Sequence, residues 1–165
     1  MTAALGPEPG WSPVEPFTLL GARRSFVSTD RADDRLRVAY FRRSSDDALV
    51  GKVWFGPGTE GPPGRVHGGS IAAVLDEAMG AAAWMRNWPV VAGQLSIAFN
   101  RFIPLGNVVA FEAWIDQLAP RTMQIKARLL AEGGEDQPYA EASGTFVRIS
   151  LDRIRAEPDA RLEST

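Results

Sequence analysis

Residues 67–86 decide the fold, and they read HGGSIAAVLDEAMGAAAWMR. Ser70 can cap a helix, Ile71 to about Arg86 can form its body, and Pro89 lies just beyond it as a stop signal. Almost every position of that body is apolar or small, and a helix that is apolar nearly all round is a buried one. The stretch therefore predicts one long helix that other elements must cover on most sides.

Strand patterns on both sides of this helix can supply that cover. Leu36 to Phe41 and Leu49 to Phe55 carry β-branched and aromatic residues and flank a turn at residues 44–47. After the helix, apolar residues recur with period two in four further strands. Their apolar members are Leu95, Ile97, Phe99 and Ile103; Val109, Phe111, Ala113 and Ile115; Met123, Ile125, Ala127 and Leu129; and those of Tyr139 to Ser150. We predict the α+β class, with a curved antiparallel sheet wrapped around one long central helix.

The chain is expected to form one domain, at residues 17–152. Residues 1–16 are rich in Pro and Gly and predict a flexible arm, and residues 153–165 predict a charged tail that frays. Within residues 16–34, the pattern fits a short helix around Phe17, Leu19 and Leu20 and an edge strand at Ser25 to Thr29. We expect turns at residues 30–35 and 132–136, and a loop dense in Gly and Pro at 56–64.

Composition excludes several classes of function. The 165 residues include 18 Lys and Arg against 20 Asp and Glu, so no basic face for nucleic acid is expected. The chain has no cysteine and one histidine, which argues against disulfides, a thiol nucleophile and a histidine-rich zinc site, so no metal is expected. No apolar run reaches the roughly 20 residues of a membrane span, and the first residues do not resemble a signal peptide. A cytoplasmic location is the prediction.

Asp76 is the anomaly within the helix, because a buried carboxylate is costly unless it is hydrogen-bonded or paired. Its neighbours three and four residues away are Ala72, Ala73, Met79 and Gly80, a face on which a slim ligand can come close. The alternative is that Asp76 is a structural residue bonded to a neighbouring loop. Glu77 lies on the next stripe and is expected to be a salt-bridge or surface group.

The helix entrance is the second candidate for chemistry. Gly68 and Gly69 can expose backbone N–H groups at a helix N-terminus, where the helix dipole attracts anions and developing oxyanions. The alternative is that the two glycines only permit a tight entry turn. His67 is expected either to anchor that loop through a hydrogen bond or to touch a substrate carbonyl. No Gly-x-Ser-x-Gly elbow is present.

The residues GPPGRVHGGSIAAVLDEAMG, from Gly61 to Gly80, resemble the signature of hotdog-fold acyl-CoA thioesterases. The likeness is to the phenylacetyl-CoA-thioesterase-like branch and its long-chain acyl-CoA relatives, in which the aspartate also follows the histidine by nine residues. Two later stretches, Asn100 to Gly106 and Pro120 to Thr122, resemble a strand end and a turn of the same family. The resemblance covers about residues 36–150.

This resemblance implies hydrolysis of an acyl-CoA thioester, without metal or prosthetic group, since CoA arrives as part of the substrate. Asp76 would be general base or nucleophile, the Gly68 N–H would polarise the thioester carbonyl, and His67 would shape that pocket. Family members are homodimers, often dimers of dimers, with the site between subunits, so Asp76 and Gly68 would come from different chains. The predicted substrate contacts are Gly69, Gln94, Ser96, Asn100, Arg121 and Thr122.

Two departures from the family pattern keep alternatives open, and one of them is Pro120, which stands where the family's turn usually has Gly before the arginine. Ala92 stands where the long-chain relatives carry a threonine, so water positioning would fall to Gln94 or Ser96, or be absent. A non-catalytic acyl-CoA or lipid-binding protein, or a regulatory scaffold, is therefore the second hypothesis. A hotdog hydratase is a third, less favoured because it needs a histidine elsewhere. Trp84, Met85, Trp88 and Phe99 are expected either to line an acyl tunnel or to belong to the core or to a dimer contact.

Overall fold

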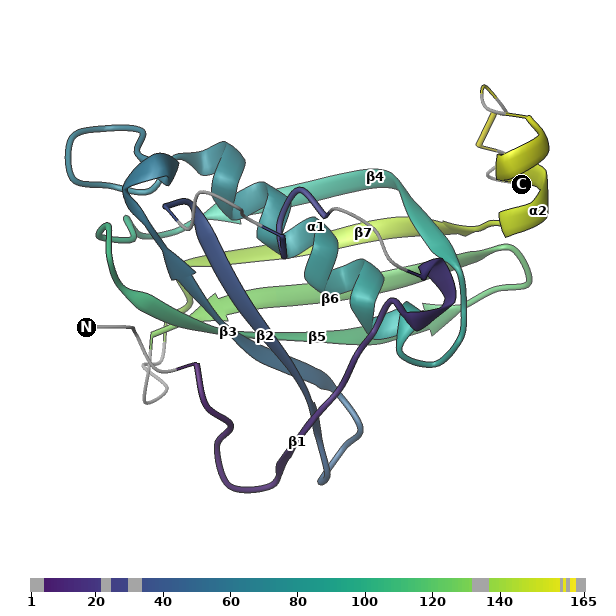
Figure 1. Cartoon of the computed structure of the whole chain (residues 1–165), viewed down its shortest axis with the longest axis horizontal. Helices are drawn as coiled ribbons and strands as arrows, with labels where there is room; N and C mark the ends of the chain where they lie inside the picture. Colours follow the sequence, from purple (N-terminus) through teal and green to yellow (C-terminus); the bar gives the residue numbers. More distant parts are fainter. Residues whose placement is uncertain are drawn as a thin grey trace.

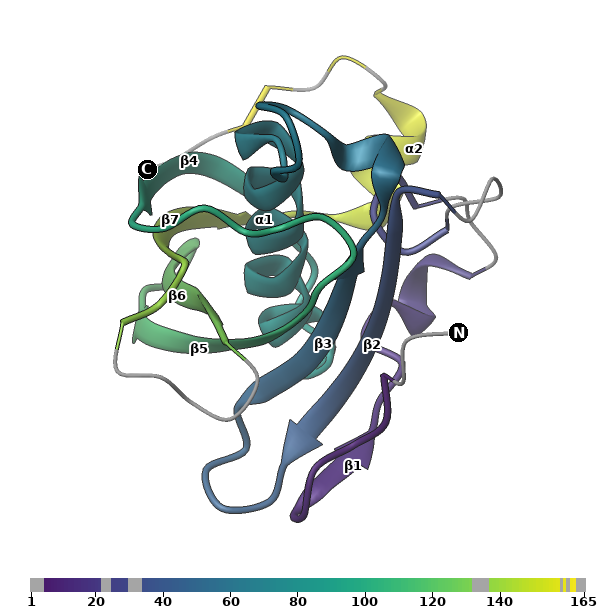
Figure 2. The ribbon, with the colours of Figure 1, turned by 90° about the vertical axis from the view of Figure 1, so that its left-hand side faces the viewer.

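One antiparallel sheet curls around one long helix in the computed structural model, which describes residues 5–21, 25–29, 34–131, 137–157, 159 and 161–162. Figure 1 shows helix α1 lying along the concave side of the sheet, and Figure 2 shows the strands bending around it. The elements are β1 (Trp11–Pro13), η1 (Thr18–Leu20), β2 (Leu36–Arg43), β3 (Leu49–Phe55), η2 (Pro57–Thr59), α1 (Gly68–Trp84), β4 (Val90–Phe99), β5 (Val108–Leu118), β6 (Thr122–Leu130), β7 (Ala140–Arg148) and α2 (Leu151–Ala156).

The seven strands of the described sheet run in the order β1-β2-β3-β5-β6-β7-β4, and each pairs antiparallel with its neighbours. This confirms the predicted fold class. Alternation decides which face is buried: in β6, Met123, Ile125, Ala127 and Leu129 are buried against α1, and the residues between them are not. The strand that follows the helix in sequence, β4, lies at the far edge of the sheet, beside β7.

The helix starts earlier than predicted. It begins at Gly68, and its N-cap is His67, whose imidazole Nδ1 accepts the Gly69 N–H at 2.8 Å. The predicted cap, Ser70, lies inside the first turn, so that assignment is wrong. Glycine is a poor helix former, and the pair hid the first turn from a pattern-based prediction. The helix ends at Trp84, before the predicted Arg86, because a left-handed residue, Asn87 at φ 58°, follows and turns the chain.

The N-terminal segment lies across the side of α1 that the sheet leaves open. A short 3-10 helix, η1, stands where a short helix was expected, and its Leu20 and the preceding Phe17 pack on the core. Ser25 to Thr29 is a turn in which the Thr29 N–H donates to the Ser25 carbonyl, so the edge strand expected there is wrong. The predicted turn at 132–136, and most of that at 30–35, lie outside the described residues.

Two further differences concern chain ends. Ile103 was predicted to share a strand face with Leu95, but β4 ends at Phe99 and Ile103 is fully buried from the following loop. After β7 the chain forms a short helix, α2, capped by Ser150, where a frayed tail was expected to begin. None of the described helices is long and apolar enough to cross a membrane.

Candidate active site

Asp76 faces a hollow of about 460 Å³ between α1 and the N-terminal segment. Its side chain is half-buried, and among the described residues no donor binds its carboxylate. Burial raises the pKa of Asp76 above its ordinary value, and the neighbouring Glu77 charge raises it further. The structural alternative, a carboxylate bonded to a neighbouring loop, therefore finds no partner in the described part of the chain.

Glu77 has the partners that Asp76 lacks. The Ser25 hydroxyl donates to one carboxylate oxygen at 2.7 Å, and the Tyr40 hydroxyl donates to the other. Among the described residues, the partners of Glu77 are these two neutral hydroxyls rather than a cation, and the expected salt bridge stays a prediction. Two carboxylates thus stand side by side on α1, one held by hydrogen bonds and one open to the hollow.

The helix entrance carries the second set of predicted groups. His67 is exposed and acts as the cap, which confirms the loop-anchoring alternative; the Gly69 N–H is used in that cap. The Gly68 N–H has no acceptor among the described residues. Gly68 borders a separate hollow of about 260 Å³, next to Phe99, which is 53% exposed.

Asp76 and Gly68 do not meet within one chain. They are eight residues apart on α1, which places them about 12 Å apart along the helix axis at a rise of 1.5 Å per residue. The two hollows that they line share no residue. A thioester bound at one of these groups is therefore out of reach of the other in the same chain.

A sequence model of the thioesterase superfamily matches residues 63–137. The acyl-coenzyme A thioesterase THEM5 of Homo sapiens is 32% identical over 101 residues, which cover 59% of this chain and 40% of that protein. These similarities, together with the fold, support the hotdog thioesterase superfamily as the family of residues 63–137. The chain spans 40% to 50% of the length of the curated relatives that it matches.

Solved structures of thioesterase proteins share the fold. A thioesterase superfamily protein is 26% identical, with 67% of this chain and 53% of that chain covered at a TM-score of 0.61. A hypothetical thioesterase protein of Streptococcus pneumoniae, solved with coenzyme A, is 16% identical and shows the fold alone. It covers 70% of this chain and 87% of that chain, also at a TM-score of 0.61.

The remaining predicted substrate contacts do not line the Asp76 hollow. Gln94 and Ser96 alternate with Leu95 and Ile97, which pack on the core, so they point to the other side of β4. Asn100 lies at the Gly68 hollow and donates to Glu141 at 3.2 Å. Where the long-chain relatives of the superfamily are expected to carry threonine, Ala92 lines the Asp76 hollow.

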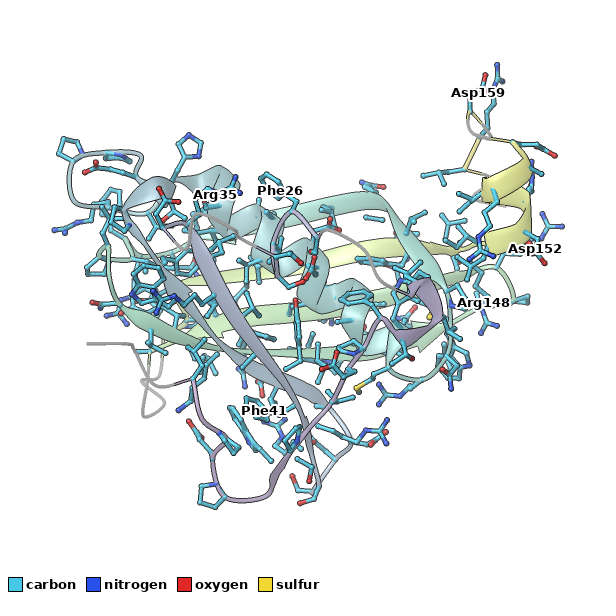
Figure 3. All side chains as sticks on the ribbon, in the orientation of Figure 1. Phe26, Arg35, Phe41, Arg148, Asp152 and Asp159 are labelled. Carbon is cyan, nitrogen blue, oxygen red and sulfur yellow. The ribbon has the colours of Figure 1, made fainter. Side chains whose placement is uncertain are left out.

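Arg121 and Thr122 lie at the turn between β5 and β6, away from both hollows. Arg121 lines a third hollow of about 280 Å³ with Arg148 and two arginines of the C-terminal region. Thr122 begins β6 opposite Val147. Figure 3 shows Arg148 at the α2 end of the molecule, whereas Phe26 lies over α1.

Sequence reasoning missed the N-terminal contribution to this site. Phe17, Leu20, Phe26 and Val27 line the Asp76 hollow, and Ser25 reaches Glu77, 52 residues along the chain. Of the four aromatic and sulfur residues proposed for a tunnel, Trp84 lines the hollow and Phe99 stands at the Gly68 hollow. Met85 is core, and Trp88 packs against the core. Among the described residues, no three metal-binding side chains cluster.

Proposed function

We propose that this chain hydrolyses an acyl-CoA thioester to the free acid and CoA, with Asp76 as the reacting carboxylate. One observation carries the proposal: a half-buried carboxylate without a hydrogen-bond donor among the described residues faces an apolar hollow. The name of the human relative, and the coenzyme A in the pneumococcal structure, support CoA thioesters as the substrate class. No cofactor enters the proposed reaction beyond the CoA that the substrate carries.

In this reaction Asp76 acts as general base for water or attacks the thioester carbonyl itself. A raised pKa suits a general base, since proton transfer is most effective when the pKa of the base approaches the working pH. The base pathway deprotonates water as it adds to the carbonyl, and CoA leaves as thiolate. The nucleophile pathway passes through a mixed anhydride, which water then hydrolyses.

We further propose that the site is completed by a second copy of the chain. The carbonyl oxygen would accept the Gly68 N–H of the other subunit, because the 12 Å helical offset keeps Gly68 of the same chain away. Two features support a dimer: β4 is an edge strand with its outer hydrogen-bonding groups unpaired in the sheet, and most of its residues from Gly93 to Phe99 are exposed. Association of such dimers in pairs stays a prediction, as does the cytoplasmic location.

The predicted contacts outside the hollow would meet the CoA portion of the substrate. These are Gly69, Gln94, Ser96, Asn100, Arg121 and Thr122, none of which lines the Asp76 hollow. Arg121 is exposed beside Arg148, so phosphate groups can reach both guanidinium groups without a desolvation cost. His67 would hold the Gly68 N–H in place through its cap rather than touch the thioester.

Turnover of a panel of CoA esters by wild type and by Asp76→Asn tests the function. The variant should stay folded and lose about 10²- to 10⁴-fold in kcat, because the amide cannot accept the proton. Asp116→Asn is the matched control, since that exposed carboxylate pairs with Lys126 on the surface at 3.1 Å and should not affect turnover. Equal rates for wild type and Asp76→Asn would refute the role of Asp76.

One observation favours a second candidate, a non-catalytic acyl-CoA binder. Ala92 presents a methyl group to the Asp76 hollow where a threonine hydroxyl could position water. Calorimetry with the same esters separates the two: tight binding of an ester that the wild type never hydrolyses would favour the binder.

A further inference from the structure

The hollow beside Asp76 has a wall from the N-terminal segment, which the superfamily match does not include. The match begins at residue 63, whereas Phe17, Leu20, Phe26 and Val27 come from the N-terminal segment. These four side chains face α1 and the beginning of β4 across the hollow. This wall is therefore a property of this chain beyond the matched region.

The lining of the hollow selects the chemistry of its occupant. Asp76 and Glu77 are the only polar side chains among the described lining residues, and Glu77 is already bound by two hydroxyls. The other side chains are hydrocarbon or aromatic, including Trp84, Phe146 and Ile149. The pantetheine arm of CoA has amides that would lose hydrogen bonds there, whereas a hydrocarbon chain gains from leaving water. The volume of about 460 Å³ lies within the usual range of small-molecule sites.

Contacts to α1 and β2 hold the N-terminal wall in place. Ser25 donates to Glu77 at 2.7 Å, and Tyr40 of β2 donates to the same carboxylate. The Phe17 ring lies edge-on to Tyr40 at 6.2 Å and tilted against Trp84 at 6.0 Å, between ring centroids. Glu77 thus joins the helix that carries Asp76 to the wall opposite it.

We propose that this hollow binds the acyl group of the substrate. Phe17 and Leu20 determine which acyl groups fit. Glu77, Ser25 and Tyr40 are positioning residues that hold the N-terminal wall beside Asp76. The inference rests on the proposed thioesterase activity. It predicts a preference for apolar acyl groups over polar or charged ones, because the free space is bounded by apolar side chains and by two carboxylates.

Acyl selectivity is the direct test. The kcat/KM for CoA esters of increasing chain length is measured for wild type, Phe17→Ala, Leu20→Ala and Leu20→Phe. The two alanine variants should lose about tenfold or more on the preferred ester and shift preference to bulkier acyl groups, whereas Leu20→Phe should shift it to shorter ones. Leu19→Ala is the matched control, since Leu19 is 41% exposed and does not line the hollow.

The outcomes separate this inference from the proposed function. If wild type hydrolyses no ester, the proposed function fails. If wild type is active and the Phe17 and Leu20 variants change kcat/KM equally for all acyl groups, acetyl included, the hollow holds pantetheine and the inference is overturned. An unchanged chain-length profile in all three variants also overturns it.

Glu77 is tested by two substitutions that differ in what they keep. Glu77→Gln keeps one of the two acceptor oxygens, so it can still bind the hydroxyl of Ser25 or of Tyr40, but it loses the charge; Glu77→Ala loses both acceptors and the charge. Among the described lining residues, Asp76 and Glu77 are the titratable groups, with the Tyr40 phenol bound to Glu77. Removing the Glu77 charge lowers the pKa of Asp76, so the acidic limb of kcat/KM should move to lower pH in both variants.

Of these two variants, only Glu77→Ala should also lose the wild-type acyl preference. The double variant Ser25→Ala with Tyr40→Phe should lose that preference too, while it leaves the Glu77 charge in place. A merely structural Glu77 predicts lower protein stability with an unchanged pH profile and chain-length profile. That result would overturn its positioning role.

Discussion

Gly68→Pro removes one hydrogen atom that the proposed mechanism needs and disturbs little else. Gly68 is the first residue of α1, a position at which proline is well tolerated because its missing N–H makes no intrahelical bond. The preceding residue, His67, has φ −66° and ψ 137°, the extended conformation that proline requires before it. Gly68→Ala is the control, since its added Cβ would lie 3.6 Å from the nearest Phe99 ring atom and its N–H remains.

The expected loss follows from the value of one oxyanion donor. Removing such a donor costs about 10²–10³ in kcat, or about 2.7–4 kcal/mol of transition-state stabilisation. Gly68→Ala should stay within a few-fold of wild type. In a symmetric dimer each site takes Asp76 from one chain and Gly68 from the other, so both homodimers, Gly68→Pro and Asp76→Asn, should be nearly inactive.

Heterodimers of these two variants decide whether the site is shared. One site of the heterodimer combines both substitutions, and the other has the intact Asp76 and the intact Gly68. Two differently tagged chains are co-expressed, purified by both tags and assayed, and about half of wild-type activity per dimer is expected. A heterodimer no more active than its parents, or an active enzyme that is monomeric at assay concentration, would refute the reasoning.

Three further predictions concern stability. Asp76→Asn should raise the free energy of unfolding at neutral pH. The pKa of Asp76 is raised in the folded protein, so its charged form destabilises the fold once the pH rises from the ordinary pKa of 3.8 through the pKa in the folded state. Urea titrations below pH 3.8 should show no difference between variant and wild type, and a higher stability of the variant at that pH would contradict this cause. His67→Ala should lower the free energy of unfolding by about 0.5–2 kcal/mol in the same urea titration, because the helix loses its cap. His67→Asn can still cap the helix and should retain most of that stability. Gly51→Ala should destabilise the protein by about 1–3 kcal/mol or more, since its Cβ would lie 2.2 Å from a phenylalanine ring atom and 2.3 Å from a backbone oxygen. Gly6→Ala, whose Cβ would have nothing within 4 Å, should match wild type. Equal losses of stability in the two variants would contradict the close approach at Gly51.

Local patterns account for what could be predicted of the fold. Period-two alternation identifies β5 and β6 because each side chain of a strand points to one face, and burial of one face is enough to mark it. The helix was found from its apolar length, but its first turn was missed. A histidine cap followed by two glycines does not resemble the usual start signal, and only the 2.8 Å contact from the Gly69 N–H to His67 reveals it.

The sequence by itself determined that α1 is buried and that Asp76 on it is anomalous, since a carboxylate among small apolar residues stands out in composition alone. Only the tertiary structure decided what surrounds that carboxylate. Ser25 and Tyr40 reach Glu77 across 52 and 37 residues of chain, and no local pattern encodes contacts at such separations. The same packing placed an apolar wall opposite Asp76. The helix itself keeps Gly68 about 12 Å away along its axis, because its residues follow one another at a constant rise.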